Sequence, residues 1–180
     1  MSEPDVFFSK VVIIGVGLIG SSFARALKQR NLCEQIVGCG RSLATLEDAL
    51  ALGVIDVAET DLQLAVQGAD LVFLAMPIGA TETVLASIAP YLEAKTIITD
   101  AGSVKCNVID AARRVFGDLP AHFIPGHPIA GSERSGVAAG KADLFEHHKV
   151  ILTPLPENSV SALAAVRAVW AKLGAEVIVM

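Results

Sequence analysis

KVVIIGVGLIGSS, residues 10–22, is the stretch that decides the fold of this chain. Its β-branched residues predict a buried strand at 11–14, and its glycines predict a tight turn that opens a helix. Gly15 makes the turn, Gly17 lets a ligand approach the backbone, and Gly20 lets the helix pack closely on the strand. Leu18 and Ile19 begin the helix, whose unpaired N–H groups and positive dipole end attract phosphate. The stretch predicts a pyrophosphate site for a dinucleotide; a glycine turn without a ligand is the alternative.

The length and the pattern of apolar residues favour one α/β domain. With 180 residues, of which 53% are hydrophobic, the chain has room for one full domain at 1–180 and little more. The apolar residues come in short runs separated by Gly, Pro, Asp and Thr, and the mean hydropathy is +0.57. Strands that are buried on both faces of a parallel sheet show this pattern. We therefore expect a doubly wound, mainly parallel sheet of the Rossmann type.

Strand and helix patterns alternate along the chain. We expect strands at 11–14, 35–39, 56–58, 71–75, 96–99, 122–124, 150–153 and 176–179, and helices at 18–30, 43–52, 62–67, 81–91, 104–116 and 159–173. Residues 125–145 are expected to form a long irregular segment, and such long connections are usually functional. Ligands of doubly wound sheets bind outside the carboxyl ends of the strands. The segments that begin at Gly15, Gly40, Met76, Asp100 and Pro125 are therefore expected to converge on one cleft.

Composition excludes several classes of partner. No apolar run approaches the roughly 18 to 20 residues of a membrane span, and the start, MSEPD, lacks the basic head of a signal peptide. The net charge of −5 and the pI near 5.3 argue against nucleic acid and anionic membranes. Cys33, Cys39 and Cys106 have no metal-type spacing, so we expect free thiols, no zinc and no disulfide. These features indicate a cytoplasmic protein.

The residues after the second strand favour NADP(H) over NAD(H). In NAD-binding domains an acidic residue about twenty positions beyond the glycines bonds the ribose 2′-hydroxyl. Here that position is Gly40, which leaves space for a 2′-phosphate that Arg41 and Ser42 could bind. Alternatively, Arg41 is a solvated surface residue and Ser42 only a helix N-cap, in which case NAD use stays open. Met76 and Pro77, after the strand at 71–75, are expected to form one wall of the cofactor site.

Candidate catalytic residues follow the later strands. His127 leads the segment at 125–145, so its imidazole is expected to face the cleft, where its ordinary pKa suits it to take a hydroxyl proton. Ser103 can orient that imidazole or a substrate hydroxyl, or simply cap the next helix. Glu133 and Lys105 can bind a charged substrate or lie in solvent, and for Lys105 we favour a structural ion pair. No role is assigned to the remaining histidines, His122, His147 and His148.

These motifs together resemble the prephenate/arogenate dehydrogenase family of tyrosine biosynthesis. The resemblance rests on GVGLIGS at 15–21, on DAGSVK at 100–105 and on GHPIAGSERSG at 126–136, and it covers nearly the whole chain. It implies that His127 bonds the ring hydroxyl of the substrate and acts as the base, that Ser103 positions that histidine, and that Glu133 belongs to a polar network at the site entrance. It also implies hydride transfer to the nicotinamide and loss of carbon dioxide, with no metal.

Two departures from the family pattern bear on these expectations. The acidic residue usual at Gly40 is absent, which fits the NADP-using branch. The family also has a second, all-helical domain that carries substrate-carboxylate ligands and the dimer interface, and this chain stops at Met180, where that domain would begin. We expect a homodimer through that domain and little activity from 1–180 alone. The alternatives are an enzyme of the β-hydroxyacid dehydrogenase and imine reductase type and a non-catalytic NADP-binding module.

Overall fold

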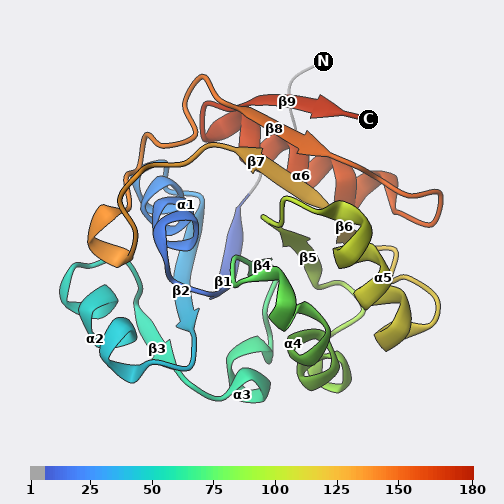
Figure 1. Cartoon of the computed structure of the whole chain (residues 1–180), viewed down its shortest axis with the longest axis horizontal. Helices are drawn as coiled ribbons and strands as arrows, with labels where there is room; N and C mark the ends of the chain where they lie inside the picture. The colour runs from blue at the N-terminus through green and yellow to red at the C-terminus, as the bar shows by residue number, and fades with distance from the viewer. Residues whose placement is uncertain (1–6) are drawn as a thin grey trace.

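The computed structural model describes residues 7–180, so the first residues, which we used to argue against a signal peptide, lie outside the described range. A parallel sheet of six strands runs through the molecule in the order β3-β2-β1-β4-β5-β6 (Figure 1). The order reverses direction between β1 and β4, as in a doubly wound fold. The strands are β1 (Phe8–Ile14), β2 (Cys33–Cys39), β3 (Val57–Glu59), β4 (Leu71–Leu74), β5 (Ile97–Asp100) and β6 (Phe123–Ile124).

Helices cover both faces of this sheet, which confirms the predicted fold class. One face packs against α1 (Leu18–Gln29), α2 (Leu43–Ala51) and α6 (Val160–Lys172), and the other against α3 (Leu62–Val66), α4 (Thr81–Ile88) and α5 (Lys105–Phe116). Short 3-10 turns lie at η1 (Ile78–Ala80), η2 (Ala89–Tyr91) and η3 (Val137–Ala139). Pro90 lies inside η2 and explains why α4 ends earlier than predicted, since proline has no N–H to donate. Within residues 7–180, no helix has the length and apolar character needed to cross a membrane.

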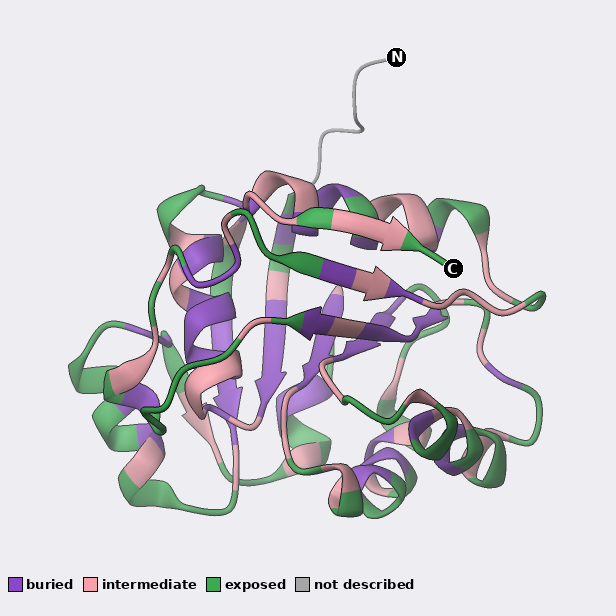
Figure 2. Cartoon of the chain, turned by 45° about the horizontal axis from the view of Figure 1, so that its top comes forward, coloured by how far each residue is buried: buried purple, intermediate pink, exposed green. Residues whose placement is uncertain are grey.

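In the main sheet β4, β5 and β6 are buried along their whole length, and β1 and β2 are buried over their last four residues (Figure 2). On the α1 and α6 face, the core centres on Phe23, Phe73, Phe145 and Trp170. The ring centroids of Phe23 and Phe73 are 4.2 Å apart, and that of Trp170 is 5.0 Å from both Phe23 and Phe145. Because Trp170 belongs to α6, this aromatic cluster fixes the last helix against the centre of the sheet.

A second sheet of three strands was not predicted as such. It consists of β7 (Gly126–Ile129), β8 (Lys149–Leu152) and β9 (Glu176–Val179), with β7 antiparallel to β8 and β8 parallel to β9. The prediction of an irregular segment over 125–145 was therefore wrong for 126–129. Pro128 makes the segment look like a loop, yet it occupies an edge strand at a position whose backbone faces away from β8, where a missing N–H costs little.

Candidate functional site

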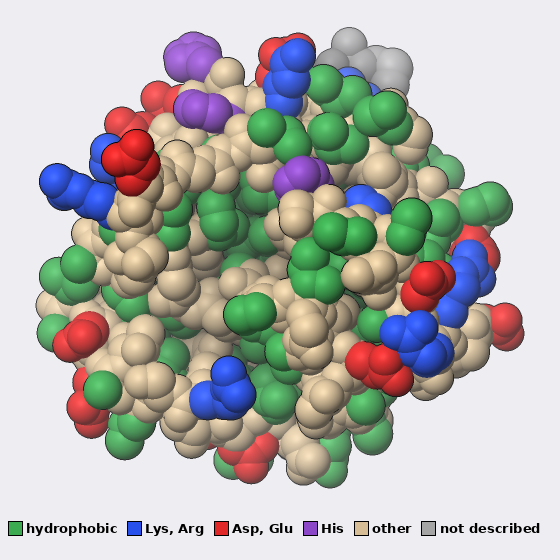
Figure 3. All heavy atoms as spheres, in the orientation of Figure 1, with side chains coloured by type: hydrophobic (Ala, Val, Ile, Leu, Met, Phe, Trp, Pro, Cys, Tyr) green, Lys and Arg blue, Asp and Glu red, His purple; other side chains and the backbone are tan. Residues whose placement is uncertain are grey.

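The carboxyl ends of neighbouring strands meet at one edge of the main sheet, as predicted. The amide of Gly15 donates to the carbonyl of Cys39 at 2.9 Å, and the amide of Ala75 donates to the carbonyl of Ile14 at 2.8 Å. β5 ends at the same edge through its parallel pairing with β4. The face of the molecule drawn in Figure 3 is hollowed near its centre, between α1 and β7 as Figure 1 places them. The loops after these strands therefore surround one cleft.

The glycine turn is shaped as its sequence predicts. Gly15 has a φ of +95°, and a Cβ there would lie 2.7 Å from the backbone of Ala75 and Met76. At Gly20 a Cβ would collide with the carbonyl oxygen of Gly15, so helix and turn are in direct contact. At Gly17, in contrast, a Cβ would meet nothing within 4 Å. The turn is therefore packed on the protein side and open on the side where a pyrophosphate would approach.

The start of α1 is suited to an anion. Its N-cap is Gly17, which has no side chain to bond the free N–H groups, and the first turn carries no acidic residue. The open space beside the turn and these unpaired donors match the pyrophosphate of a dinucleotide. On the next turn, the amide of Lys141 donates to Ser22 Oγ at 3.0 Å, and Gly140 lies directly against Ser21. The segment after β7 is thus held against α1 beside the turn.

The end of β2 combines an open glycine, a free cation and a helix start. A Cβ at Gly40 would have only Leu46 Cδ2 nearby, at 4.0 Å, so the backbone is accessible. Arg41 is exposed and takes part in no ion pair with another described residue. Ser42 is the N-cap of α2, where its Oγ accepts from the amide of Thr45 at 3.3 Å. Capping uses Ser42 Oγ as an acceptor, and its own proton stays free to bond an anion.

A buried ion pair lies beneath the cleft, between β5 and α5. Asp100 is 2% exposed and forms an ion pair with Lys105 at the first position of α5. Asp100 Oδ2 also accepts from the amide of Gly102 at 2.9 Å, and Oδ1 accepts from the amide of Gly126 at 3.0 Å. Lys105 Nζ donates to the carbonyl of Gly126. Burial raises the pKa of Asp100 and lowers the pKa of Lys105, and their mutual attraction opposes both changes.

His127 follows Gly126 on β7 and is half-buried, next to the point where Gly126 contacts the end of β5. Its pKa is lowered, first by desolvation and then by the positive charge of Lys105, while the Asp100 carboxylate opposes the change. This direction favours the neutral imidazole, the form that can accept a proton. The expected structural ion pair of Lys105 is confirmed. From the sequence, Asp100 received no predicted role beyond its place in the motif at 100–105. An acidic residue that ends a buried strand three residues before Ser103 is a signal that could have pointed to it.

The remaining predicted site residues are mostly exposed. Ser103 is exposed and is not a helix cap, because Val104 occupies the N-cap of α5 without a side-chain bond. Glu133 is also exposed, on the segment that follows β7. Met76 is half-buried and Pro77 exposed, immediately after β4 and in line with the glycine turn. The part of the chain that the structure describes holds no group of three or more His, Cys, Asp or Glu side chains placed to bind a metal ion.

Comparison with known proteins gives a consistent result. The family model described as "Prephenate dehydrogenase, nucleotide-binding domain" matches residues 23–179. The cyclohexadienyl dehydrogenase of Zymomonas mobilis is 41% identical over 174 residues, which covers 96% of this chain and 58% of that protein.

Solved structures agree with the family match. The prephenate dehydrogenase of A. aeolicus in complex with hydroxyphenyl propionate and NAD+ superposes with a TM-score of 0.88 at 32% identity, over 96% of this chain and 59% of that chain. The arogenate dehydrogenase of Synechocystis superposes with a TM-score of 0.86 at 32% identity, over 95% of this chain and 59% of that one. The chain therefore spans less than two thirds of the length of these relatives.

Proposed function

This chain belongs to the prephenate dehydrogenase family, and on that premise we propose that it forms the dinucleotide-binding part of an enzyme that oxidatively decarboxylates arogenate or prephenate in tyrosine biosynthesis. One observation carries the proposal. His127 is half-buried and directly follows Gly126, whose amide bonds Asp100 at the end of β5, and the open glycine turn follows β1 of the same parallel sheet. A proton acceptor beside a dinucleotide site is what the oxidation of a ring alcohol requires.

The proposed roles of the residues follow from their positions. The turn at Gly17 and the first N–H groups of α1 hold the pyrophosphate, and Met76 and Pro77 form a wall of the cofactor site. When bound, the nicotinamide supplies the hydride acceptor. His127 takes the proton of the substrate hydroxyl, Ser103 orients the reacting groups, and Glu133 contributes to the polar entrance. Departure of carbon dioxide then makes the ring aromatic, so the residues need supply no separate acid for that step.

The cofactor preference is proposed to be NADP(H). The support is the accessible Gly40, followed by Arg41, which forms no ion pair within residues 7–180, and by the free proton of Ser42 at the start of α2. NADP use associates the chain with arogenate rather than prephenate within the family. We expect Arg41→Ala to weaken NADPH binding about tenfold or more while NADH binding changes little, because only NADPH carries the 2′-phosphate. Equal losses for both cofactors in parallel titrations would show that Arg41 does not bind the phosphate.

The proposed division of labour predicts partial function for residues 1–180. Because relatives are longer than the matched region, we propose that substrate-carboxylate ligands and a homodimer interface lie in the unmatched part of such enzymes. Purified 1–180 should bind NADPH in calorimetry yet reduce little NADP+ with either substrate, since an open cleft places the ring carbon poorly. Robust steady-state turnover by 1–180 would place the whole substrate site inside this domain.

The deciding assay uses the gene product at its full encoded length. Prephenate and arogenate are each supplied with NADP+ or NAD+, and the reduced nicotinamide and the carbon dioxide are both measured. The proposal requires turnover of at least one substrate with equal yields of the two products. Cofactor binding without turnover of either substrate would instead support a non-catalytic NADP-binding module.

A cytoplasmic location is proposed from the free thiols, of which Cys33 and Cys39 have their pKa raised to about 11 by burial.

A further inference from the structure

Gly126 is held by both of its backbone groups. Its amide donates to Asp100 Oδ1 at 3.0 Å, and its carbonyl accepts from Lys105 Nζ. Asp100 and Lys105 are themselves an ion pair with side chains only 3% and 14% exposed. One buried carboxylate and one largely buried ammonium therefore bind the residue that directly precedes His127.

These two bonds take the place of a neighbouring strand. β7 is an edge strand of the second sheet, with β8 on one side only. The carbonyl of Pro125 accepts from the amide of Thr153 at 3.0 Å, so Pro125 faces the β8 side, and the backbone groups of the next residue, Gly126, face away from it. Unbonded, those groups would be buried polar atoms without partners. The ion pair of Asp100 and Lys105 provides these hydrogen-bond partners and connects the end of β5 to the strand that carries His127.

Neighbouring atoms pack closely around Gly126 and fix its position. A Cβ there would lie 3.1 Å from the carbonyl oxygen of Asp100, 3.2 Å from Thr99 Oγ1 and 3.3 Å from Leu152 Cδ2. β7 and β5 are thus in direct contact at this point, although they belong to different sheets. The location of His127 relative to the main sheet, and so to the glycine turn, depends on this contact.

We propose that Asp100 and Lys105 are positioning residues that hold His127 at the cleft through their bonds to Gly126. The expected effect on turnover rests on the proposed function, whereas the positioning of His127 by the ion pair does not. All polar partners of the Asp100 oxygens are donors, so the carboxylate is the form that the site accommodates. The Lys105 ammonium bonds the carbonyl of Gly126, which belongs to the peptide group that joins Gly126 to His127. Asp100 bonds the amide on the other side of Gly126.

The charged groups around His127 come from few elements. α5 contributes Lys105 and β5 contributes Asp100. On β8 the one titratable side chain is Lys149, which is exposed and pairs with Ile129 rather than with His127. Lys105 is thus the cation that acts on the imidazole, and its effect exceeds that of Asp100. Removal of the Lys105 charge should therefore raise the pKa of His127.

The test is a histidine NMR titration of residues 1–180, with the His127 resonance assigned from His127→Asn. In the wild type, His127 should titrate below its ordinary pKa of about 6.5. Lys105→Gln keeps a donor and removes the charge, and we expect the His127 pKa to rise by about one pH unit. The matched control is Arg114→Met, which removes a cation from the same helix in an exposed ion pair with Glu82 and should leave the His127 pKa unchanged. An unchanged pKa in folded Lys105→Gln overturns the proposal.

Enzyme kinetics of the full-length gene product test the effect of Lys105 on turnover. Lys105→Gln should lower kcat/KM about 10- to 100-fold and shift the acid limb of the pH profile upward, with the NADPH dissociation constant within about threefold of wild type. A wild type that oxidises neither substrate rejects the proposed function, and the NMR titration still decides the role of Lys105. Hydrogen exchange on the wild type keeps the test decisive where variants unfold. A rapidly exchanging Gly126 amide, in place of the slow one expected, rejects the positioning role.

Discussion

Gly17 and Gly126 are both glycines at the cleft, but they are used in opposite ways. Beside Gly17 the space is empty, and a Cβ there would meet nothing within 4 Å. Beside Gly126 the space is filled by Asp100, Thr99 and Leu152, whose nearest atoms lie 3.1 to 3.3 Å from the position that a Cβ would take. The first glycine reserves room for a ligand that approaches the backbone. The second lets two parts of the protein approach each other.

The difference extends to how each half of the site is assembled. The turn of Gly17 lies within one continuous stretch of strand, turn and helix, which packs at Gly15 against the residues that follow β4. The surroundings of Gly126 come from β5, α5 and β8, which are far apart in sequence. We therefore expect substitutions in the first half to affect cofactor affinity and substitutions in the second half to affect turnover.

The largest effect is expected at His127. His127→Asn keeps a hydrogen-bonding group but cannot take up the proton, so turnover at full encoded length should fall by about 100- to 10,000-fold. NADPH affinity, measured by calorimetry, should stay near the wild-type value because the glycine turn is untouched. A loss of turnover below tenfold would remove His127 from the role of base.

Gly17→Val tests the open side of the comparison. The valine side chain would occupy the space for the pyrophosphate, and NADPH affinity should fall by about 100-fold or more, with the melting temperature nearly unchanged. Gly20→Val is the contrasting variant, since its side chain would collide with the carbonyl of Gly15 and should destabilise the fold itself. Normal NADPH binding by folded Gly17→Val would show that the cofactor does not use this turn.

The pH dependence of stability and of kcat/KM tests the half of the site that contains Gly126 and His127. Because the His127 pKa is lowered in the folded state, the fold favours the neutral imidazole. The contribution of this residue to stability is present above about pH 6.5 and is lost as the pH falls through the lower folded-state value. The acid limb of kcat/KM should have its midpoint below pH 6.5 and disappear in His127→Asn. A wild-type midpoint above that value contradicts the assignment.

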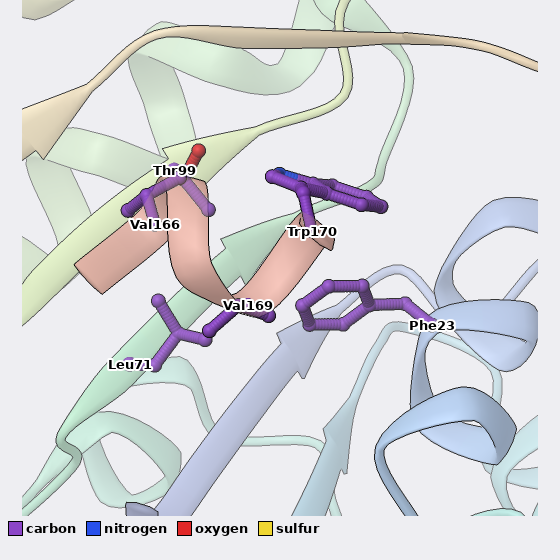
Figure 4. A pocket seen from close by; sticks show the side chains of 6 residues that line it. All are labelled: Phe23, Leu71, Thr99, Val166, Val169 and Trp170. Atoms are coloured by element: carbon purple, nitrogen blue, oxygen red, sulfur yellow. The ribbon is translucent and has the colours of Figure 1, made fainter. Parts of the chain in front are cut away.

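The smallest effect concerns Thr99, the neighbour of Asp100 on β5. Asp100 has every oxygen bonded, whereas Thr99 Oγ1 is buried and has no hydrogen-bond partner among the described residues. Thr99 lines a narrow gap, too small for a water molecule, together with Phe23 and Trp170 (Figure 4). Thr99→Val should stabilise the protein by about 1 kcal/mol and raise Tm by about 2–4 °C, measured by calorimetry. A lower Tm would mean that the hydroxyl has a partner.

Much of the main sheet could be predicted because its signals are local. Short apolar runs identified the strands, and the end of β2 at Cys39 and the α2 cap at Ser42 could be located by counting. The second sheet could not be predicted, because Pro125 and Pro128 make β7 resemble a loop, and the pairing of β7 with β8 joins residues twenty or more positions apart. The alternative that Ser103 caps α5 was wrong, since the helix begins after Val104.

The sequence by itself determined the glycine turn, the order of strands and helices, and the identity of His127 as the candidate base, because each depends on neighbouring residues and on the spacing of glycines or apolar side chains. Only the tertiary structure decided that Asp100 and Lys105 hold Gly126 and act on His127. That contact requires two sheets to meet at one point. No local pattern encodes such a meeting, because it results from the packing of β7 against the end of β5.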